Sequence, residues 1–427
     1  MERELKAALL RDGQRMIEAL LNNRDLVPDD EPARPHETRH RHRVHHVQTL
    51  FGPIKLKRSY YHHRCAKHGR CPLDEALDLV RGHTPGLAKL ICRAATQSSS
   101  FSDAAADLAA YSGLQLDSRG FGRLVAEVAP VLRQAQSTLP ALTPKSGPLE
   151  VLYVSCDGTG VPMRRAELQG IKGKQSDGSA HTREAKLGCV FTQTRTNDAG
   201  EPVRDHDSTS YVGTFEDCRA AGSLLRQEAQ RRSYGTAKQV VYLGDGAAWV
   251  WENARLNFPG AVQILDFYHA SEHLGRLAQG LWGSSSQQAK DTQSRWCHEL
   301  KASDSTAIIA QAERCLQTAA HALKPESIDQ VQREIDYFKT HAQRTHYGDY
   351  RRRGWFIGSG VVEAGCKTVV GRRLKQSGMF WSQRGGEDML SLRCQIMGSQ
   401  FDAAWNARLP ILTQQRKKAF RWSAPQN

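Results

Sequence analysis

Three acidic residues stand where apolar segments give way to a turn or a helix. Asp157 follows the apolar run in VLYVSCDGTGV, Asp245 follows the run in VVYLGDGAAW, and Glu363 lies in IGSGVVEAGCK. Carboxylate oxygens suit small, hard cations such as Mg²⁺ or Mn²⁺, and two such ions can activate a nucleophile and offset charge on a phosphodiester. The residues are 88 and then 118 positions apart, so only the fold can bring them together. We therefore predict a two-metal site for phosphodiester chemistry.

Positive charge is concentrated toward the end of the chain. The formal net charge is +14, and the segment from Phe338 onward holds 16 lysines and arginines against 5 aspartates and glutamates, which gives +11. Such a block is typical of nucleic-acid binding, and the alternative is a solvated basic tail. The side chains expected to contact phosphates in this segment are Arg351, Arg352, Arg353, Lys367, Arg372, Arg373 and Lys375.

The elements that must position the acids follow an α/β pattern from residue 150 onward. Apolar runs predict strands near 149–157, 185–194, 208–215, 239–246 and 261–269, and helices at 216–232 and around WVWENARL. Three strands, helix, strand, helix, strand is the order of an RNase H-like mixed sheet. In that order the first and fourth strands are neighbours, so Asp157 and Asp245 are expected to meet at their carboxyl ends.

The rest of the site is expected from two later segments. Residues 271–350 lack strand character and predict an all-helical insertion, after which Ser359 is expected to cap the helix that carries Glu363. Asp266 ends a predicted strand and is a fallback metal ligand, and His269 could support the site through a hydrogen bond.

The N-terminal region predicts a small DNA-binding part made of a hairpin and helices. The first helix is amphipathic, with charges throughout, and is not expected to be a signal peptide. Residues 27–46 are rich in proline and histidine and are interpreted as a linker or disordered arm. Residues 101–113 and 118–135 predict a helix-turn-helix, with Ser118 as a cap and Arg119 and Arg123 near the start of the reading helix, or a plain helical pair.

A cluster of cysteines and histidines follows the predicted hairpin. It could bind a structural Zn²⁺, although five residues separate its two cysteines where zinc ribbons use two to four, and a metal-free hairpin is the alternative. The cluster consists of His62, Cys65, His68 and Cys71. Ten cysteines without a dense pattern favour a reducing compartment.

These features predict seven segments in a cytoplasmic protein that does not cross a membrane. They are the helix and linker (1–46), the zinc-ribbon-like hairpin (47–80), the helix-turn-helix-like part (81–140), the first part of the catalytic core (150–270), the helical insertion (271–350), the final core helix with its basic segment (351–400) and a basic tail (401–427).

Several long blocks resemble one family of proteins. The blocks TLFGPIKLKRSYYHHRC…PLDEAL, CDGTGVPM, GDGAAW, DFYHASEHL and GSGVVEAGCKTVVGRRLKQSGMFW are similar to those of DDE-type insertion-sequence transposases of the ISKra4-like group, related to the IS256 and Mutator-like assemblage. The resemblance implies that Asp157, Asp245 and Glu363 are the catalytic triad and that Asp266 and His269 form an Asp-x-x-His element beside it. It also implies double-stranded DNA partners, namely terminal inverted repeats and target DNA, and a homodimer or larger assembly on DNA. A bacterial, nucleoid-associated location is implied as well.

Two other functions remain open at this point. One is a catalytically silent DNA-binding regulator on an RNase H-like scaffold. The other is a zinc metallopeptidase, because His269, Glu272 and His273 fit a His-x-x-Glu-His pattern. The peptidase pattern leaves Asp157, Asp245 and the basic segment unexplained.

Overall fold

The computed structural model describes residues 1–63, 69–141, 149–170, 180–319, 321 and 323–422. The chain divides into two compact units, Met1–Thr138 with Phe401–Asn427, and Leu139–Gln400. No helix in the described part of the chain is long and apolar enough to cross a membrane.

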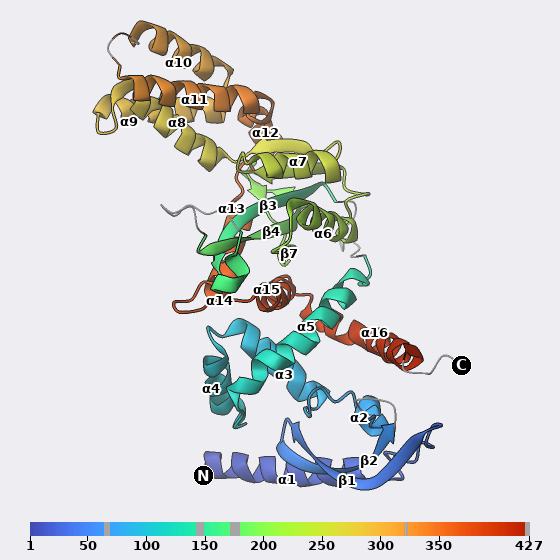
Figure 1. Cartoon of the computed structure of the whole chain (residues 1–427). Coiled ribbons are helices and arrows are strands. Elements are labelled where there is room, and N and C mark those ends of the chain that lie inside the picture. The colour runs from blue at the N-terminus through green and yellow to red at the C-terminus, as the bar shows by residue number, and fades with distance from the viewer. Residues whose placement is uncertain (64–68, 142–148, 171–179, 320, 322, 423–427) are drawn as a thin grey trace. The chain divides into compact units, whose positions relative to one another are not determined.

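The first unit joins a two-stranded ribbon to a group of helices (Figure 1). Its elements are α1 (Glu2–Asn22), β1 (Glu37–Thr49), β2 (Gly52–His63), α2 (Pro72–Ala76), α3 (Pro85–Gln97), α4 (Phe101–Ser112), α5 (Phe121–Ser137) and α16 (Phe401–Trp422). A small core of Val47, Ile54, Leu56 and Leu73 lies beneath the ribbon. The helices pack around the apolar face of α5, which buries Leu124, Val128 and Leu132.

Two expectations for this unit were wrong. Residues 37–46 are part of strand β1, paired antiparallel with β2, and not of a linker. Their sequence hides the strand because almost every side chain on both faces is polar, and pairing with the half-apolar β2 supplies the order. Ser118 is not the cap either: the Asp117 carboxylate accepts the N–H of Arg119 and begins the 3₁₀ turn before α5.

The second unit is built on a mixed five-stranded sheet in the order β7-β4-β3-β8-β9. Its strands are β3 (Val151–Pro162), β4 (Thr182–Gln193), β7 (Ser210–Thr214), β8 (Gln239–Gly244) and β9 (Val262–Leu265), with a separate short pair β5 (Arg195–Thr196) and β6 (Pro202–Val203). β3 runs antiparallel to β4 and parallel to β8, which runs parallel to β9. The predicted mixed sheet, with the first and fourth strands adjacent, is confirmed.

Helices cover both faces of this sheet. The elements are α6 (Cys218–Arg231), α7 (Ala248–Asn257), α13 (Gly360–Gly365), α14 (Arg372–Leu374) and α15 (Gln383–Met397). A Cβ at Gly188 of β4 would touch Leu225 of α6, whereas a Cβ at Gly213 of β7 would touch Leu390 of α15. Because Gly188 and Gly213 point to opposite faces, α6 and α15 cover opposite sides.

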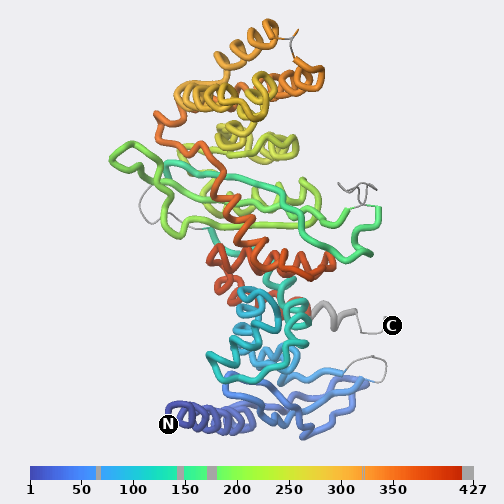
Figure 2. Tube along the Cα trace, turned by 90° about the vertical axis from the view of Figure 1, so that its left-hand side faces the viewer, coloured from blue at the N-terminus to red at the C-terminus, as the bar shows by residue number. Residues whose placement is uncertain are grey.

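The remaining helices form a bundle that begins directly after β9. They are α8 (Phe267–Trp282), α9 (Gln287–Ala302), α10 (Thr306–Ala319), α11 (Pro325–His341) and α12 (Tyr347–Arg352). Figure 2 shows α8 to α11 lying side by side. The helical character expected for 271–350 is therefore present.

The end of α11 holds a buried histidine. His341 is 5% exposed, lies 4.6 Å from the Tyr337 ring centroid, and its Nδ1 accepts a hydrogen bond from Arg344 at 3.2 Å. Burial, together with the Arg344 charge, lowers the pKa of His341 to about 4. The neutral ring is therefore favoured in the folded state, so its stabilising effect is present above pH 6.5 and is lost as the pH falls toward 4.

The free energy of unfolding should fall between pH 6.5 and 4.5 in both chains. We expect this fall to be smaller in His341→Phe than in the parent chain, by on the order of 1–2 kcal/mol. Urea unfolding of the full chain at several pH values measures this difference. His206→Phe, at an exposed histidine, is the control. An unchanged pH dependence in His341→Phe would show that the ring does not control acid stability.

Candidate active site

Four acidic residues gather at the end of the sheet where the parallel strands finish. Asp245 follows β8 directly and Asp266 follows β9 directly, and the Asp266 N–H donates to the Gly244 carbonyl at 2.7 Å. Asp157 lies in β3 two residues beyond the last pairing with β8, at Ser155. Glu363 reaches the same region from α13, which contacts β3 and β4.

The sequence predicted that Asp157 ends its strand, and this prediction is wrong. β3 continues to Pro162 because residues 158–162 keep pairing with β4. The apolar run stops at Cys156 because from Asp157 to Gly160 the side chains are only half buried. Cys156 contacts Asn253 of α7, so alternation along the strand turns Asp157 to the other face, toward α13.

The Asp157 carboxylate is held by local hydrogen bonds amid other negative charges. Its Oδ1 accepts a hydrogen bond from the Gly158 N–H at 2.6 Å, and the carboxylate also forms a hydrogen bond with the Cys366 thiol. Burial raises the pKa of Asp157, and the charges of Asp245 and Glu363 raise it further against those hydrogen bonds. Asp157 therefore interacts through space with both of the other predicted acids.

Asp245 sits in a tight turn that the helical bundle supports. Its Oδ1 accepts the Ala247 N–H at 3.0 Å, and its carbonyl accepts the Tyr337 hydroxyl at 3.3 Å. Gly246 adopts a φ of +103°, and a Cβ there would lie 2.5 Å from the Tyr337 hydroxyl oxygen. Tyr337 is fixed by stacking on His273, with ring centroids 3.5 Å apart.

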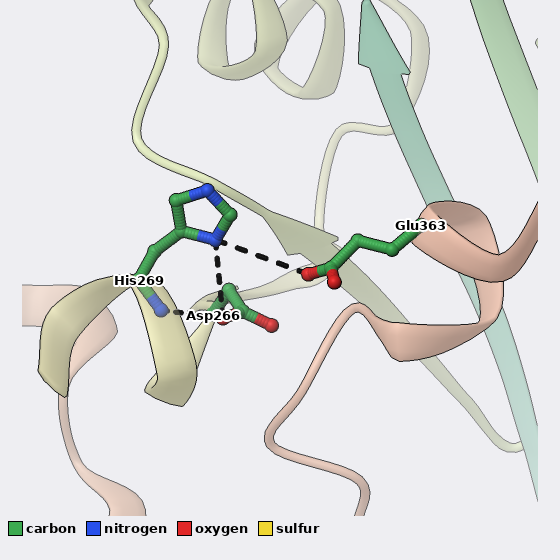
Figure 3. Close-up of side chains that lie close together, drawn as sticks. All are labelled: Asp266, His269 and Glu363. Carbon is green, nitrogen blue, oxygen red and sulfur yellow. Dashed lines mark hydrogen bonds and ion pairs between the residues drawn. The ribbon is translucent and has the colours of Figure 1, made fainter. Parts of the chain in front are cut away.

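Asp266, His269 and Glu363 form the most compact cluster (Figure 3). His269 Nδ1 lies 3.3 Å from Asp266 Oδ1 and 3.9 Å from Glu363 Oε1. Asp266 is fully buried, and its Oδ1 also accepts the His269 N–H at 2.7 Å. The hydrogen bond that His269 donates to Asp266 raises the pKa of His269 to about 9, so the charged ring is favoured at neutral pH.

Ser359 joins the two halves of this cluster. Its N–H donates to Asp266 Oδ2, and its hydroxyl donates to Glu363 Oε1 at 3.1 Å. Burial alone would raise the pKa of Asp266, but the hydrogen bonds from His269 and Ser359 lower it, so the residue stays ionised. Ser359 occupies the N-cap position of α13 without making a side-chain cap, contrary to the expected role, because its hydroxyl serves Glu363.

The structure thus brings the predicted acids together but groups them differently. Within the described residues, Asp266, His269 and Glu363 are the set whose metal-binding atoms all lie within 4.8 Å of one another. Asp157 and Asp245 lie outside that set, and Asp157 is an electrostatic neighbour of both Asp245 and Glu363. Asp266, predicted as a fallback ligand, is a central member of the cluster.

The donor chemistry at this sheet end fits a hard divalent cation. Asp157, Asp245 and Glu363 offer oxygen ligands, which Mg²⁺ and Mn²⁺ prefer. Asp266 suits a supporting role better, because it has no exposed surface and both of its oxygens already accept hydrogen bonds. His269 in its charged form has no lone pair for a metal, so a proton and a metal ion would compete for its ring.

The expected zinc cluster is only partly described. Cys65 and His68 lie outside the described residues. His62 is exposed near the end of β2, and Cys71 accepts a hydrogen bond from Arg58. Burial raises the pKa of Cys71 to about 11.

Most of the predicted phosphate-binding side chains are exposed, in keeping with that role. The exposed ones are Arg119, Arg123, Arg351, Arg352, Arg353, Lys367, Arg372 and Lys375. Arg373 differs, because it is 1% exposed and lies over the Trp381 ring at 5.2 Å. We therefore remove Arg373 from the phosphate-binding set.

The His-x-x-Glu-His pattern does not form a metal site in the described residues. His273 Nδ1 lies 2.5 Å from Glu334 Oε2 of α11, while His269 pairs with Asp266. The two histidines therefore serve different partners.

Three supporting roles were missed in the sequence. Cys366 forms a hydrogen bond with Asp157, and Ser359 forms hydrogen bonds with both Asp266 and Glu363. The Tyr337 hydroxyl donates a hydrogen bond to the Asp245 carbonyl in its turn. Ser359 was noticed only as a cap. Tyr337 is 92 residues from Asp245 and gives no local pattern that could have identified it.

Comparison with known proteins relates only the first part of the chain to a family. Residues 1–175 match an uncharacterised protein family, UPF0236. That range includes Asp157 and stops before Asp245, Asp266 and Glu363. No curated protein matches the chain. The match leaves the chemistry of the site to be argued from its residues.

The Asp245 turn gives a direct test of this geometry. Gly246→Ala should destabilise the chain by about 1–3 kcal/mol, because alanine is strained at positive φ and its Cβ would meet the Tyr337 hydroxyl. Urea unfolding measures the loss. Gly235→Ala, where a Cβ would meet nothing within 4 Å, should change stability by less than about 0.5 kcal/mol. Equal effects at the two glycines would contradict the described turn.

Proposed function

We propose that this protein is the DNA transposase of an insertion sequence, a DDE enzyme that hydrolyses a phosphodiester at the transposon end and then transfers the freed 3′ end to target DNA. The observation that carries the proposal is the gathering of Asp157, Asp245 and Glu363 at one end of parallel strands β3 and β8. The resemblance of five sequence blocks to ISKra4-like transposases supports the same assignment.

The sheet supports an RNase H-like core. Numbered along the chain, its five strands lie in the order 3-2-1-4-5. The second strand, β4, runs antiparallel to both of its neighbours, β3 and β7. In this arrangement the first and fourth strands carry acids to a common edge, and a later helix supplies the third. Asp157, Asp245 and Glu363 occupy these positions.

Each residue at the site has a distinct task in the proposed reaction. Two divalent cations held by Asp157, Asp245 and Glu363 would assist ionisation of the attacking water in hydrolysis and of the 3′-hydroxyl in strand transfer, and would offset charge on the leaving oxygen. Asp266 keeps His269 protonated, and His269 offsets part of the carboxylate charge. Ser359 fixes the orientation of Glu363, and Tyr337 fixes the backbone of Asp245.

Cationic surfaces on both units support DNA as the substrate. In the second unit, exposed Lys375 donates to Thr159 of β3, two residues from Asp157. In the first unit, a groove of about 560 Å³ lies between α1 and β2, and we call it the α1–β2 groove. Its cationic side chains are Arg11, Arg15, Lys55 and Lys57. None of these four was predicted to bind DNA.

Cleavage of DNA carrying the element's own ends tests the proposal. With Mg²⁺ or Mn²⁺, the parent chain should nick this DNA, and Asp157→Asn, Asp245→Asn and Glu363→Gln should each reduce cleavage by more than about 1,000-fold while DNA affinity stays within about threefold. Asp198→Asn, at an exposed turn beyond the other end of the sheet, should cut normally.

Calorimetric titration with Mn²⁺ separates binding from chemistry in the same variants. Asp157→Asn and Asp245→Asn should weaken Mn²⁺ binding, and Asp198→Asn should not. A parent chain that binds the DNA but never cuts it would favour the silent regulator instead. Cutting that survives in Asp157→Asn would remove this residue from the catalytic set.

The α1–β2 groove yields a separate prediction. Lys55→Gln with Lys57→Gln should lower affinity for duplex DNA and reduce the slope of log affinity against log salt concentration by about 1–2, since each lost phosphate contact removes roughly 0.9. Fluorescence anisotropy over a salt series measures the slope. The control pair is Lys290→Gln with Arg314→Gln on α9 and α10, both exposed. Equal slopes in both double variants would place DNA elsewhere.

A further inference from the structure

Helix α1 carries two different apolar faces. One faces inward, where Ile17 and Leu21 pack against the core beneath the β1–β2 ribbon. The other faces outward along the 21-residue helix, and its members are exposed. The outward stripe consists of Leu5 (60% exposed), Leu9 (62%), Met16 (73%) and Leu20 (50%).

The outward stripe is continuous along the helix. At about 100° per residue, the four side chains fall within a sector of roughly 60°. Inward packing cannot explain them, because the inner face already supplies the contacts with the core. An exposed apolar stripe of this kind is typical of a surface that is covered by a partner.

The spacing of the stripe identifies the partner. Leu5 and Leu20 are equally distant from the midpoint between Asp12 and Gly13, and Leu9 and Met16 are equally distant from the same point. If two copies of this helix pack antiparallel around that midpoint, Leu5 of each copy meets Leu20 of the other, and Leu9 meets Met16. The stripe is therefore complementary to itself, as a two-fold symmetric interface requires.

The charges beside the stripe fit the same arrangement. Asp12 and Arg15 lie on one flank and form an exposed ion pair at 3.6 Å within the chain. A two-fold axis through the midpoint brings the same flank of both helices together. Asp12 of each copy then lies about 1.5 Å along the helix axis from the other Asp12 and about 3 Å from Arg15 of the other copy, so the two arginines flank the two aspartates and offset the repulsion between them.

We propose that α1 is a dimer contact, in which the outward stripe packs antiparallel against the same stripe of a second copy of this chain. The proposal goes beyond the proposed function and does not depend on catalysis. Four side chains from each copy cover less area than the roughly 1,200 Å² of a stable interface, so the dimer formed through α1 alone is dependent on concentration.

Sedimentation of the full chain over a range of concentrations tests the contact. The parent chain should shift from monomer to dimer in the micromolar range, and Leu9→Glu with Met16→Glu should raise the dissociation constant by more than about 100-fold. The control pair, Leu256→Glu with Leu409→Glu, places the same charges at exposed leucines elsewhere and should dimerise normally. A parent chain that stays monomeric, or a stripe variant that dimerises like the parent, overturns the proposal.

Cross-linking tests the direction of the helices without relying on a disruptive variant. A mixture of Leu5→Cys and Leu20→Cys chains, treated with a short thiol cross-linker, should give more covalent dimer than either chain alone and more than the parent with its native cysteines. Strong cross-linking of each variant with itself would indicate parallel helices and overturn the antiparallel contact. No excess in the mixture would also overturn it.

Discussion

Repulsion among carboxylates is the constraint around which the second unit is arranged. Asp157, Asp245, Asp266 and Glu363 lie at one end of three parallel strands, where burial weakens the screening of charge by water. Local hydrogen bonds offset part of the electrostatic cost: the Gly158 N–H donates to Asp157, and the Ala247 N–H donates to Asp245. The charged ring of His269 compensates Asp266 and Glu363. Divalent cations at the proposed metal site would supply the rest.

The helical bundle is joined to this charged end at both of its own ends. α8 begins at Asp266, whose carboxylate caps it by accepting the His269 N–H. After α12 the chain returns to the sheet, where the Ile357 carbonyl accepts the Phe267 N–H and Ser359 bonds Asp266. In between, Tyr337 of α11 holds the Asp245 turn. The bundle therefore contributes to the site geometry even though its sequence carries none of the proposed metal ligands.

The sequence predicted the sheet and the neighbourhood of the acids, because both leave local patterns. Buried parallel strands appear as apolar runs, and Asp245 and Asp266 follow such runs directly. The pattern was less informative where a strand continues to pair with its neighbour beyond its apolar residues. β3 continues five residues past Asp157 through backbone bonds to β4, and β1 contains almost no apolar residues. Backbone pairing of this kind depends on the partner strand and cannot be seen in one segment.

The division of roles among the acids also required the fold. Sequence pattern treats Asp157, Asp245 and Asp266 alike, since each lies at the end of an apolar run. The structure separates them by what already surrounds each carboxylate: Asp266 is fully buried and holds His269 and Ser359, whereas Asp157 and Asp245 keep partial exposure. A buried carboxylate with both oxygens engaged positions its neighbours, and a partly exposed one can bind an ion that arrives from solvent. Under the proposed function, the tight cluster around Asp266 therefore organises the site, and the looser pair of Asp157 and Asp245 meets the DNA.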